Sequence, residues 1–431
     1  MVTRIHTCIV LLLTTSLIAV SATSNGESLA DAWQQALTVD PRAKTMTKLS
    51  DAAGRNLSAA RGYRLPTVSA EAAYTILDST PSINLTVPNL GKMEMAVADD
   101  SFAFSRATVT IPLYTHGRIS SGIDAAAAMV GAAKYDQRRT MQEIKLDVAE
   151  RYVAVLRAER GAAVAKSSVT SLSGHVRDVE NLFSQGLVAK NDLLASHVAL
   201  SEANLRLLQA QNRLDIARSA YNRLMERSLT TSVILDDIMP MVTEDSYETL
   251  VAGALKNRPE LASLTQHEGA FRHQAAGIRG ATGPQIALSG GYTYLENQQL
   301  VRDQFWSVSL GLKWDLFDGG VLRNQAAAVS YKADAVSNQI SDLRSLVTLQ
   351  IRQAWLEVEE SRQRIVVARE AVGQAEENLA VANDRYRNGI GTNTEVLDAD
   401  TLTNRSHANY DNAVYDSVIA QFRLRRAAGD L

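Results

Sequence analysis

The amino-acid sequence contains the same unit twice, and this duplication limits the folds that the 431-residue chain can adopt. The segment 37–41 (LTVDP) is matched by 255–259 (LKNRP), 218 residues further along the chain. Later in the repeat the offset is 203, which relates 183–186 (FSQG) to 386–389 (YRNG). A duplicated chain of this kind is expected to build two copies of one set of elements.

The two offsets also predict the boundaries of the repeats. We expect a first repeat over 23–228, a connecting segment at 229–246, and a second repeat over 247–431. Each repeat is predicted to run through a helix, two strands, a very long helix, a glycine-marked turn and another long helix. The change of offset gives the first copy about 15 extra residues, which fall in the Pro-, Asn- and Asp-containing stretch 78–100 and predict a long loop.

Very long helices are predicted by the distribution of proline and by heptad spacing. Only eight prolines occur, none of them after Pro284, and proline breaks helix interiors. From Val347 to Tyr386, apolar or small residues recur in alternating steps of four and three, which is a heptad seam. An unbroken helix over the 70 residues 319–388 would be on the order of 100 Å long. No compact domain needs such a helix.

The predicted strands have the length and alternation of membrane strands. The segment 305–317 alternates apolar and polar residues, whereas a strand in a soluble protein usually has about 5 or 6 residues and a tilted membrane strand about 9 to 11. Aromatic residues at both ends of the apolar face are typical of the girdle of an outer-membrane barrel. The girdle residues we expect are Trp306, Trp314, Tyr292 and Tyr294.

The chain is expected to contribute four strands to a barrel. In the first repeat, 67–77 alternates cleanly, but 102–113 leaves its lipid-facing side open: the repeat places Val109 and Ile111 outward and turns Phe102 and Phe104 toward the lumen. Four strands cannot close a membrane barrel, because bacterial barrels begin at about 8. Several chains must therefore share one barrel.

The N-terminus predicts export. Arg4 precedes an apolar run over 9–20, and small residues end at Ala22, so we expect a signal peptide over 1–22. The only cysteine, Cys8, lies inside it, which excludes a disulfide in the mature chain and fits the periplasm or outer membrane. The net charge of −3 provides no basic face for nucleic acid.

With these features in place, the chain resembles the TolC-like outer-membrane efflux protein family over nearly its whole mature length. The resemblance is carried by the duplication, by 316–320 (LFDGG) with Arg323 after it, and by 386–389 (YRNG) leading to 395–399 (EVLDA). It implies a mainly α fold with membrane β structure. Four strands per chain would contribute to a trimeric, 12-stranded outer-membrane β-barrel, continuous with a long periplasmic α-helical barrel.

The resemblance also implies a function and partners. The homotrimer is expected in the outer membrane, with a large periplasmic part and contacts to outer-membrane lipid. It would serve a tripartite efflux pump or a type I secretion system, with a periplasmic adaptor and an inner-membrane pump of the RND or ABC type. The exported substrate stays open among drugs, metal ions, organic acids and proteins.

Two predicted turns carry the candidate functional residues. Glu395 and Asp398 are one helical turn apart, and the resemblance places them, with Asp192 of the first copy, at the periplasmic gate. The plainer interpretation is that these acids offset a helix dipole at an N-terminus, capped by Thr392, Asn393 or Thr394.

The same turns are expected to dock the adaptor, and their glycines are expected to end the preceding helices. The docking residues are Phe183, Gln185, Gly186, Leu187, Tyr386, Asn388 and Gly389.

No catalytic, cofactor-binding or metal-binding residues are predicted. The histidines lack metal-ligand spacing, and no nucleophile is paired with a base, so we expect no enzyme activity. The alternative function is a periplasmic coiled-coil adaptor (a membrane fusion protein), which also has a signal and long helices but lacks duplicated membrane strands. A second alternative is a coiled-coil spacer without a pore.

Overall fold

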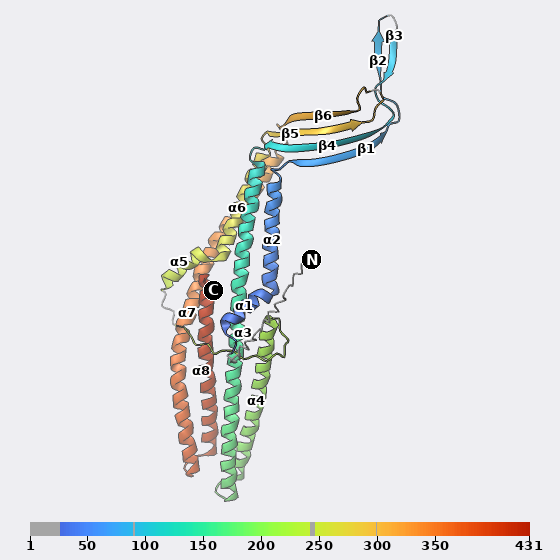
Figure 1. Cartoon of the computed structure of the whole chain (residues 1–431). Helices are drawn as coiled ribbons and strands as arrows, with labels where there is room; N and C mark the ends of the chain where they lie inside the picture. Colours follow the sequence, from blue (N-terminus) through green and yellow to red (C-terminus); the bar gives the residue numbers. More distant parts are fainter. Residues whose placement is uncertain (1–25, 89–90, 242–245, 299) are drawn as a thin grey trace, which may run out of the picture.

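The computed structural model describes residues 26–88, 91–241, 246–298 and 300–431, so the expected signal peptide over 1–22 lies outside the described residues. Apart from the additional strands β2 and β3 of the first half, the same series of elements occurs in both halves (Figure 1). The first half contains α1 (Leu29–Val39), α2 (Pro41–Gly62), β1 (Thr67–Ile76), β2 (Ser82–Val87), β3 (Gly91–Ala96), β4 (Ser101–Tyr114), α3 (Arg118–Ser184) and α4 (Lys190–Leu224). The second half contains α5 (Tyr247–Asn257), α6 (Pro259–Gly280), β5 (Gln285–Leu295), β6 (Gln304–Lys313), α7 (Val321–Arg387) and α8 (Asn393–Ala428).

The long helices follow directly from the strands. The helices α3 and α7 each have 67 residues, on the order of 100 Å, as the proline-free heptad pattern predicts. Each begins after a glycine in the left-handed region, Gly117 (φ 81°) and Gly320 (φ 80°), where a side chain would be strained. Only the short connections 115–117 and 314–320 separate β4 from α3 and β6 from α7, so the sheet leads closely into the helical layer (Figure 1).

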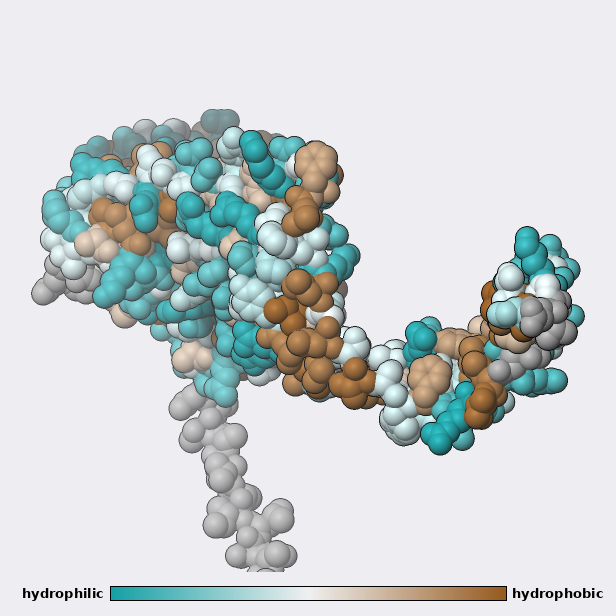
Figure 2. Space-filling model, turned by 90° about the horizontal axis from the view of Figure 1, so that it is seen from above, coloured by the Kyte–Doolittle hydropathy of each residue, from teal (hydrophilic) through white to brown (hydrophobic). Residues whose placement is uncertain are grey.

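One antiparallel sheet has the strand order β1-β4-β5-β6. Its register places Val68, Val109, Gly290 and Val308 in one row, so the alternating apolar residues of all four strands share a face. That face is exposed: Trp306 is 79% and Leu310 68% accessible. Figure 2 shows hydrophobic residues along the arm that the sheet forms beside the helical body.

The register also places the residues whose orientation the sequence left open. Val109 and Ile111 lie on the apolar face, opposite Gly290 and Leu288. Phe102 and Phe104 lie on the other face with Arg106, whose guanidinium is 5.0 Å from the centre of the Phe104 ring and pairs with Glu71 at 3.5 Å. The second face is therefore polar apart from its aromatic end.

The expected girdle residues lie near both ends of the apolar face. Tyr292 and Trp306 are direct cross-strand neighbours with ring centres 5.2 Å apart, and Tyr294 lies two residues further along β5. Trp314 falls one residue beyond β6, where its indole nitrogen donates to the Thr282 carbonyl at 3.0 Å.

The stretch 78–100 is not the loop that its Pro, Asn and Asp content predicts. It contains the antiparallel hairpin β2–β3, which extends from the end of the sheet (Figure 1). The reason is a short alternation that places Ile83 opposite Met95 and Leu85 opposite Met93, so one face of the hairpin is apolar.

The helices form a layer in which α3 packs on α4, α7 packs on α8, and α3 packs on α8. On the side of the strands, α2 and α6 take the places of α4 and α8 beside α3 and α7 (Figure 1). The connecting segment crosses this layer at mid-height, where the Tyr152 hydroxyl donates to the carbonyls of Glu27 (2.6 Å) and Asp236 (2.7 Å). None of the described helices has the length and apolar character of a membrane span.

Candidate gate and docking site

The two helical hairpins α3–α4 and α7–α8 end together at the tip furthest from the sheet (Figure 1). Each turn has a glycine in the left-handed region, Gly186 and Gly389, both at φ 72°. The Gly186 amide donates to the Phe183 carbonyl at 2.9 Å, and the Gly389 amide donates to the Tyr386 carbonyl at 3.0 Å. These bonds use carbonyls that a helix end leaves unpaired, which is why glycine stops both long helices here.

Most of the predicted docking residues are exposed at these turns. Leu187 is 67% accessible, and Phe183, Gln185, Gly186, Asn388 and Gly389 are also exposed. Tyr386 differs, because only 5% of it is accessible and it packs with Val179 and Val396 in the apolar core of the tip. Its side chain is therefore not part of the exposed surface.

Glu395 and Asp398 lie on one exposed side of the first turns of α8. Glu395 belongs to a capping box: its amide donates to the Thr392 hydroxyl at 3.2 Å, and its carboxylate accepts from the Thr392 amide at 3.4 Å. The Arg385 guanidinium is also 3.8 Å from this carboxylate. The Asp398 carboxylate makes no hydrogen bond or ion pair with any residue that the structure describes, so it is free to meet an ion or another copy.

Asp192 occupies the first turn of α4 and is half-buried beside the core of the tip. Its carbonyl accepts from the Ser196 hydroxyl at 2.9 Å and from the Asn393 amide group at 3.1 Å. Its carboxylate, with that of Asp178, raises the pKa of Tyr386, although burial of the phenol is the larger cause. The Tyr386 hydroxyl has no hydrogen-bond partner within the described chain.

A buried polar network joins the two hairpins at this point, and sequence reasoning did not find it. Asn393 is 3% accessible, and its carbonyl oxygen accepts from His175 Nε2 at 2.7 Å and from the Ser196 hydroxyl at 3.0 Å. Because an amide oxygen only accepts, His175 Nε2 carries the proton in this arrangement. The His175 ring also lies 5.2 Å from that of Tyr386. Asn393 therefore connects α8 to both α3 and α4.

Two further contacts tie the hairpins together. The Arg387 guanidinium on α7 is 3.1 Å from the Asp178 carboxylate on α3. Deeper in the layer, the buried Asp400 carboxylate on α8 accepts from the Ser168 hydroxyl on α3 at 3.1 Å and from the Asn404 amide group at 2.8 Å. Burial raises the pKa of Asp400, and these hydrogen bonds act against that shift.

No group of three or more His, Asp or Glu side chains among the described residues is placed to hold a metal ion. The sheet instead has a long exposed apolar face, and it leads into long helices that end in paired tips. This arrangement suits the wall of a tube. Comparison with known proteins identifies the family of the chain.

A family model described as "Outer membrane efflux protein" matches residues 32–225 and 250–430. The chain belongs to this outer membrane efflux protein family. It is 21% identical to outer membrane protein TolC of Vibrio cholerae serotype O1, over 94% of this chain and 91% of that protein. It is 27% identical to outer membrane efflux protein BepC of Brucella suis biovar 1, over 72% of this chain and 68% of that protein.

Solved structures confirm the expected fold. The outer-membrane channel OprN superposes with a TM-score of 0.78 at 18% identity, over 94% of this chain and 90% of that one. The outer membrane protein VceC from Vibrio cholerae gives the same TM-score at 16% identity, over 93% of this chain and 96% of that one. Family membership establishes an outer-membrane channel protein, which differs from the periplasmic adaptor of the alternative interpretation.

Proposed function

We propose that three copies of this efflux protein close into one duct, with a 12-stranded barrel in the outer membrane and a helical barrel in the periplasm. The observation that carries the proposal is the four-stranded sheet, which has an exposed apolar face and is joined by short connections to helices of 67 residues. Such a face suits lipid, while the other face carries Ser, Thr and the Glu71–Arg106 pair and suits a water-filled lumen. Four strands leave two open edges, which neighbouring copies would pair.

The tips are proposed to meet a periplasmic adaptor that connects the duct to an inner-membrane pump of the RND or ABC type. Support comes from the exposed residues at both turns, Phe183, Gln185, Gly186, Leu187, Asn388 and Gly389. A protein exposing Phe183 and Leu187 at a helix end presents an apolar anchor surrounded by polar groups, which is typical of an interface. The proposed duct would serve efflux or type I secretion; one relative carries the name "Alkaline protease secretion protein AprF".

Glu395 and Asp398 are proposed to line the gate at the inner end of the duct, with Asp192 close behind them. Three copies of each exposed carboxylate would make an acidic ring, which attracts cations and holds divalent ions. The free carboxylate of Asp398 supports this role, while Glu395 also caps α8.

The gate is tested by Glu395→Ala with Asp398→Ala in planar bilayers. We expect higher conductance and weaker block by divalent cations, because the acidic ring is lost. Thr394→Ala, on the same turn, is the matched control. Unchanged conductance and unchanged block in the double variant would remove the gate assignment.

The duct itself is tested on the detergent-extracted protein. We expect a trimer that dissociates only on heating and single-channel conductance in planar bilayers. A protein that is soluble without detergent and does not conduct would refute the duct.

A further inference from the structure

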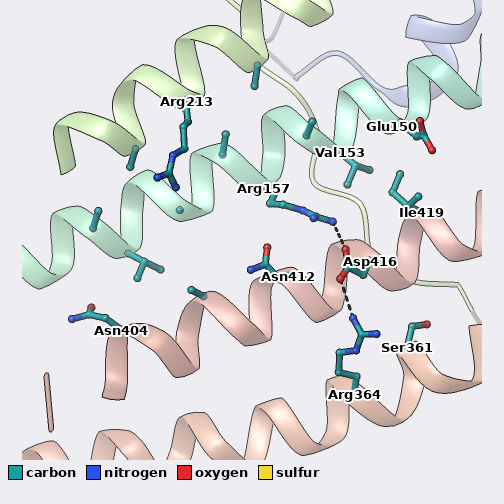
Figure 3. A pocket seen from close by; sticks show the side chains of 18 of the residues that line it. Glu150, Val153, Arg157, Arg213, Ser361, Arg364, Asn404, Asn412, Asp416 and Ile419 are labelled. Carbon is teal, nitrogen blue, oxygen red and sulfur yellow. Dashed lines mark hydrogen bonds and ion pairs between the residues drawn. The ribbon is translucent and has the colours of Figure 1, made fainter. Parts of the chain in front are cut away.

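A groove of about 1200 Å³ runs along the helical layer between the mid-height segment and the tip. The helices α3, α4, α7 and α8 all line it, and Figure 3 shows it from close by. It does not overlap the gate residues or the turns proposed to dock the adaptor.

The groove lies on the side of the layer opposite to the described part of the connecting segment, 229–241. On α3, Tyr152 bonds to the connecting segment, whereas Ala154, two positions later, lines the groove. On α8, Gln421 bonds to the backbone of Met241, whereas Arg423, two positions later, lines the groove. Two positions on an α-helix are about 200° apart, so both helices present opposite sides to the segment and to the groove.

A layer that closes into a tube has its hollow side toward the axis. The groove would therefore form part of the lumen wall of the duct, and the connecting segment would lie outside. This step depends on the proposed function, because only closure of the layer makes the groove luminal.

The charged residues of the groove are unevenly paired. Arg157, Arg206, Arg213, Arg364 and Arg423 line it together with Glu150, Glu357, Glu360 and Asp416. Arg157 and Arg364 reach Asp416 from opposite sides at 2.6 and 3.1 Å (Figure 3). Arg364 also contacts Glu360 at 2.6 Å, and Arg423 contacts Glu150 at 3.0 Å.

Two guanidinium groups on α4 have no such partner. Arg206 and Arg213 are exposed, and neither makes a hydrogen bond or an ion pair with any described residue. Arg206 acts only through space on the buried Asp400, where its charge opposes the rise in the pKa of that carboxyl. In Figure 3, Arg213 extends from α4 toward the groove.

Arg206 and Arg213 are seven positions apart, which is two helical turns, so they lie on one side of α4, roughly 10 Å apart along the axis. A free guanidinium binds a carboxylate through two parallel hydrogen bonds, and it stays charged at every physiological pH. Asn412, whose amide group also lines the groove, adds a neutral donor.

We propose that this groove binds small organic anions with two or more carboxylates, and that Arg206 and Arg213 are its specificity-determining residues. The duct thereby favours carboxylate-bearing cargo along its wall. The acidic gate acts at the tip, at a different level from the groove.

The test uses citrate as probe and the purified trimer in detergent. Isothermal titration is expected to detect citrate binding to the unchanged protein, and Arg206→Gln with Arg213→Gln is expected to weaken it about tenfold or more, since the loss of one charge-assisted hydrogen bond corresponds to about that factor. Arg151→Gln is the matched control, because Arg151 is exposed on α3 and does not line the groove. Absence of citrate binding, or equal binding by the double variant, would overturn the proposal.

A second readout follows the same variants in planar bilayers in the Glu395→Ala, Asp398→Ala background, where the acidic ring no longer limits passage. In a KCl gradient, we expect the reversal potential of channels with both arginines to lie closer to the value for a chloride-selective pore. Removal of both arginines should move the reversal potential toward the value for a potassium-selective pore. An unshifted potential in conducting trimers contradicts the anion groove alone. Absence of trimers and of conductance contradicts the duct.

Discussion

Asn393→Ala is the sharpest perturbation of the tip. The change removes the acceptor for His175 and for Ser196 and the donor to the Asp192 carbonyl, all in a site with almost no access to water. Ser196 keeps its bond to the Asp192 carbonyl, so the ring nitrogen of His175 is left as the buried donor without a partner. A buried polar group without a partner costs about 1–3 kcal/mol, and each lost hydrogen bond about 1 kcal/mol.

These contributions give a loss of about 3 kcal/mol per copy for the state in which the two hairpins are joined. At 1.4 kcal/mol per factor of ten, the ratio of separated to joined hairpins rises about a hundredfold in each copy. Because the contacts join α8 to α3 and α4, the change favours hairpins that have moved apart. We expect single-channel recordings to show larger and longer openings than those of the unchanged protein.

The control for this experiment is Thr394→Ala, because Thr394 lies next to Asn393, is exposed, and has a hydroxyl that makes no hydrogen bond with the described residues. A loss of fold is separated from gate opening by gel migration of the extracted protein, which should still show a trimer before heating. Conductance of Asn393→Ala equal to that of Thr394→Ala would show that the buried network does not hold the gate.

Three further predictions concern the membrane face, a turn and a buried acid. Leu310→Arg should prevent trimer assembly, because a basic residue on the lipid face of a barrel costs about 2–4 kcal/mol at mid-membrane. Ser309→Arg, on the opposite face of β6, should still assemble. Gel migration of the extracted proteins compares the two variants, and equal yields of trimer would contradict the orientation of β6. Gly389→Ala should lower the melting temperature, since a side chain at φ 72° costs roughly 1–2 kcal/mol. Gly373→Ala should not lower it, because this glycine lies inside α7 with open space around it. Melting curves that rank the two variants the other way would show that the left-handed conformation of Gly389 is not required at the turn. The raised pKa of Asp400 means that the folded chain holds this proton more tightly than the unfolded chain, so the free energy of unfolding should fall as pH rises above about 3.8 and through the raised pKa. Asp400→Asn should flatten this part of the curve of stability against pH. An unchanged slope would show that the burial of Asp400 does not cause the fall in stability.

Much of the fold was predictable because its signals are local and repeated. Alternation identified the faces of the strands except for 102–113, whose lipid-facing side stayed open, and the glycines at 186 and 389 marked both turns. The burial of Tyr386 was also predictable, since the heptad seam that predicted α7 ends on that residue. At this position the heptad spacing is a stronger signal than the nearness of the turn. The spacing of Thr392 and Glu395 is the signature of the capping box that the structure contains.

The rest depended on contacts between distant residues. His175 and Asn393 are 218 positions apart, and a histidine and an asparagine in two separate amphipathic helices give no sign that they meet. The groove arginines were missed for a similar reason, because exposed arginine is ordinary on a helix and only the packing of four helices shows which of these side chains have an ion-pair partner. The hairpin β2–β3 was hidden by turn-forming residues on both sides of two strands of only six residues each.

The hairpin β2–β3 makes the two repeats unequal, since the described part of the β5–β6 connection has no counterpart. In a trimer, the inner end would present six helical hairpins in pseudo-sixfold order, while the outer mouth would carry only three β-hairpins. The duct would thus have pseudo-sixfold symmetry at its inner end and threefold symmetry at its outer mouth. An adaptor that binds both helical hairpins of each copy would be present as six chains per duct, whereas an adaptor that binds only one of them would be present as three. The number of adaptor chains per duct therefore shows whether the two repeats are still equivalent at the tip.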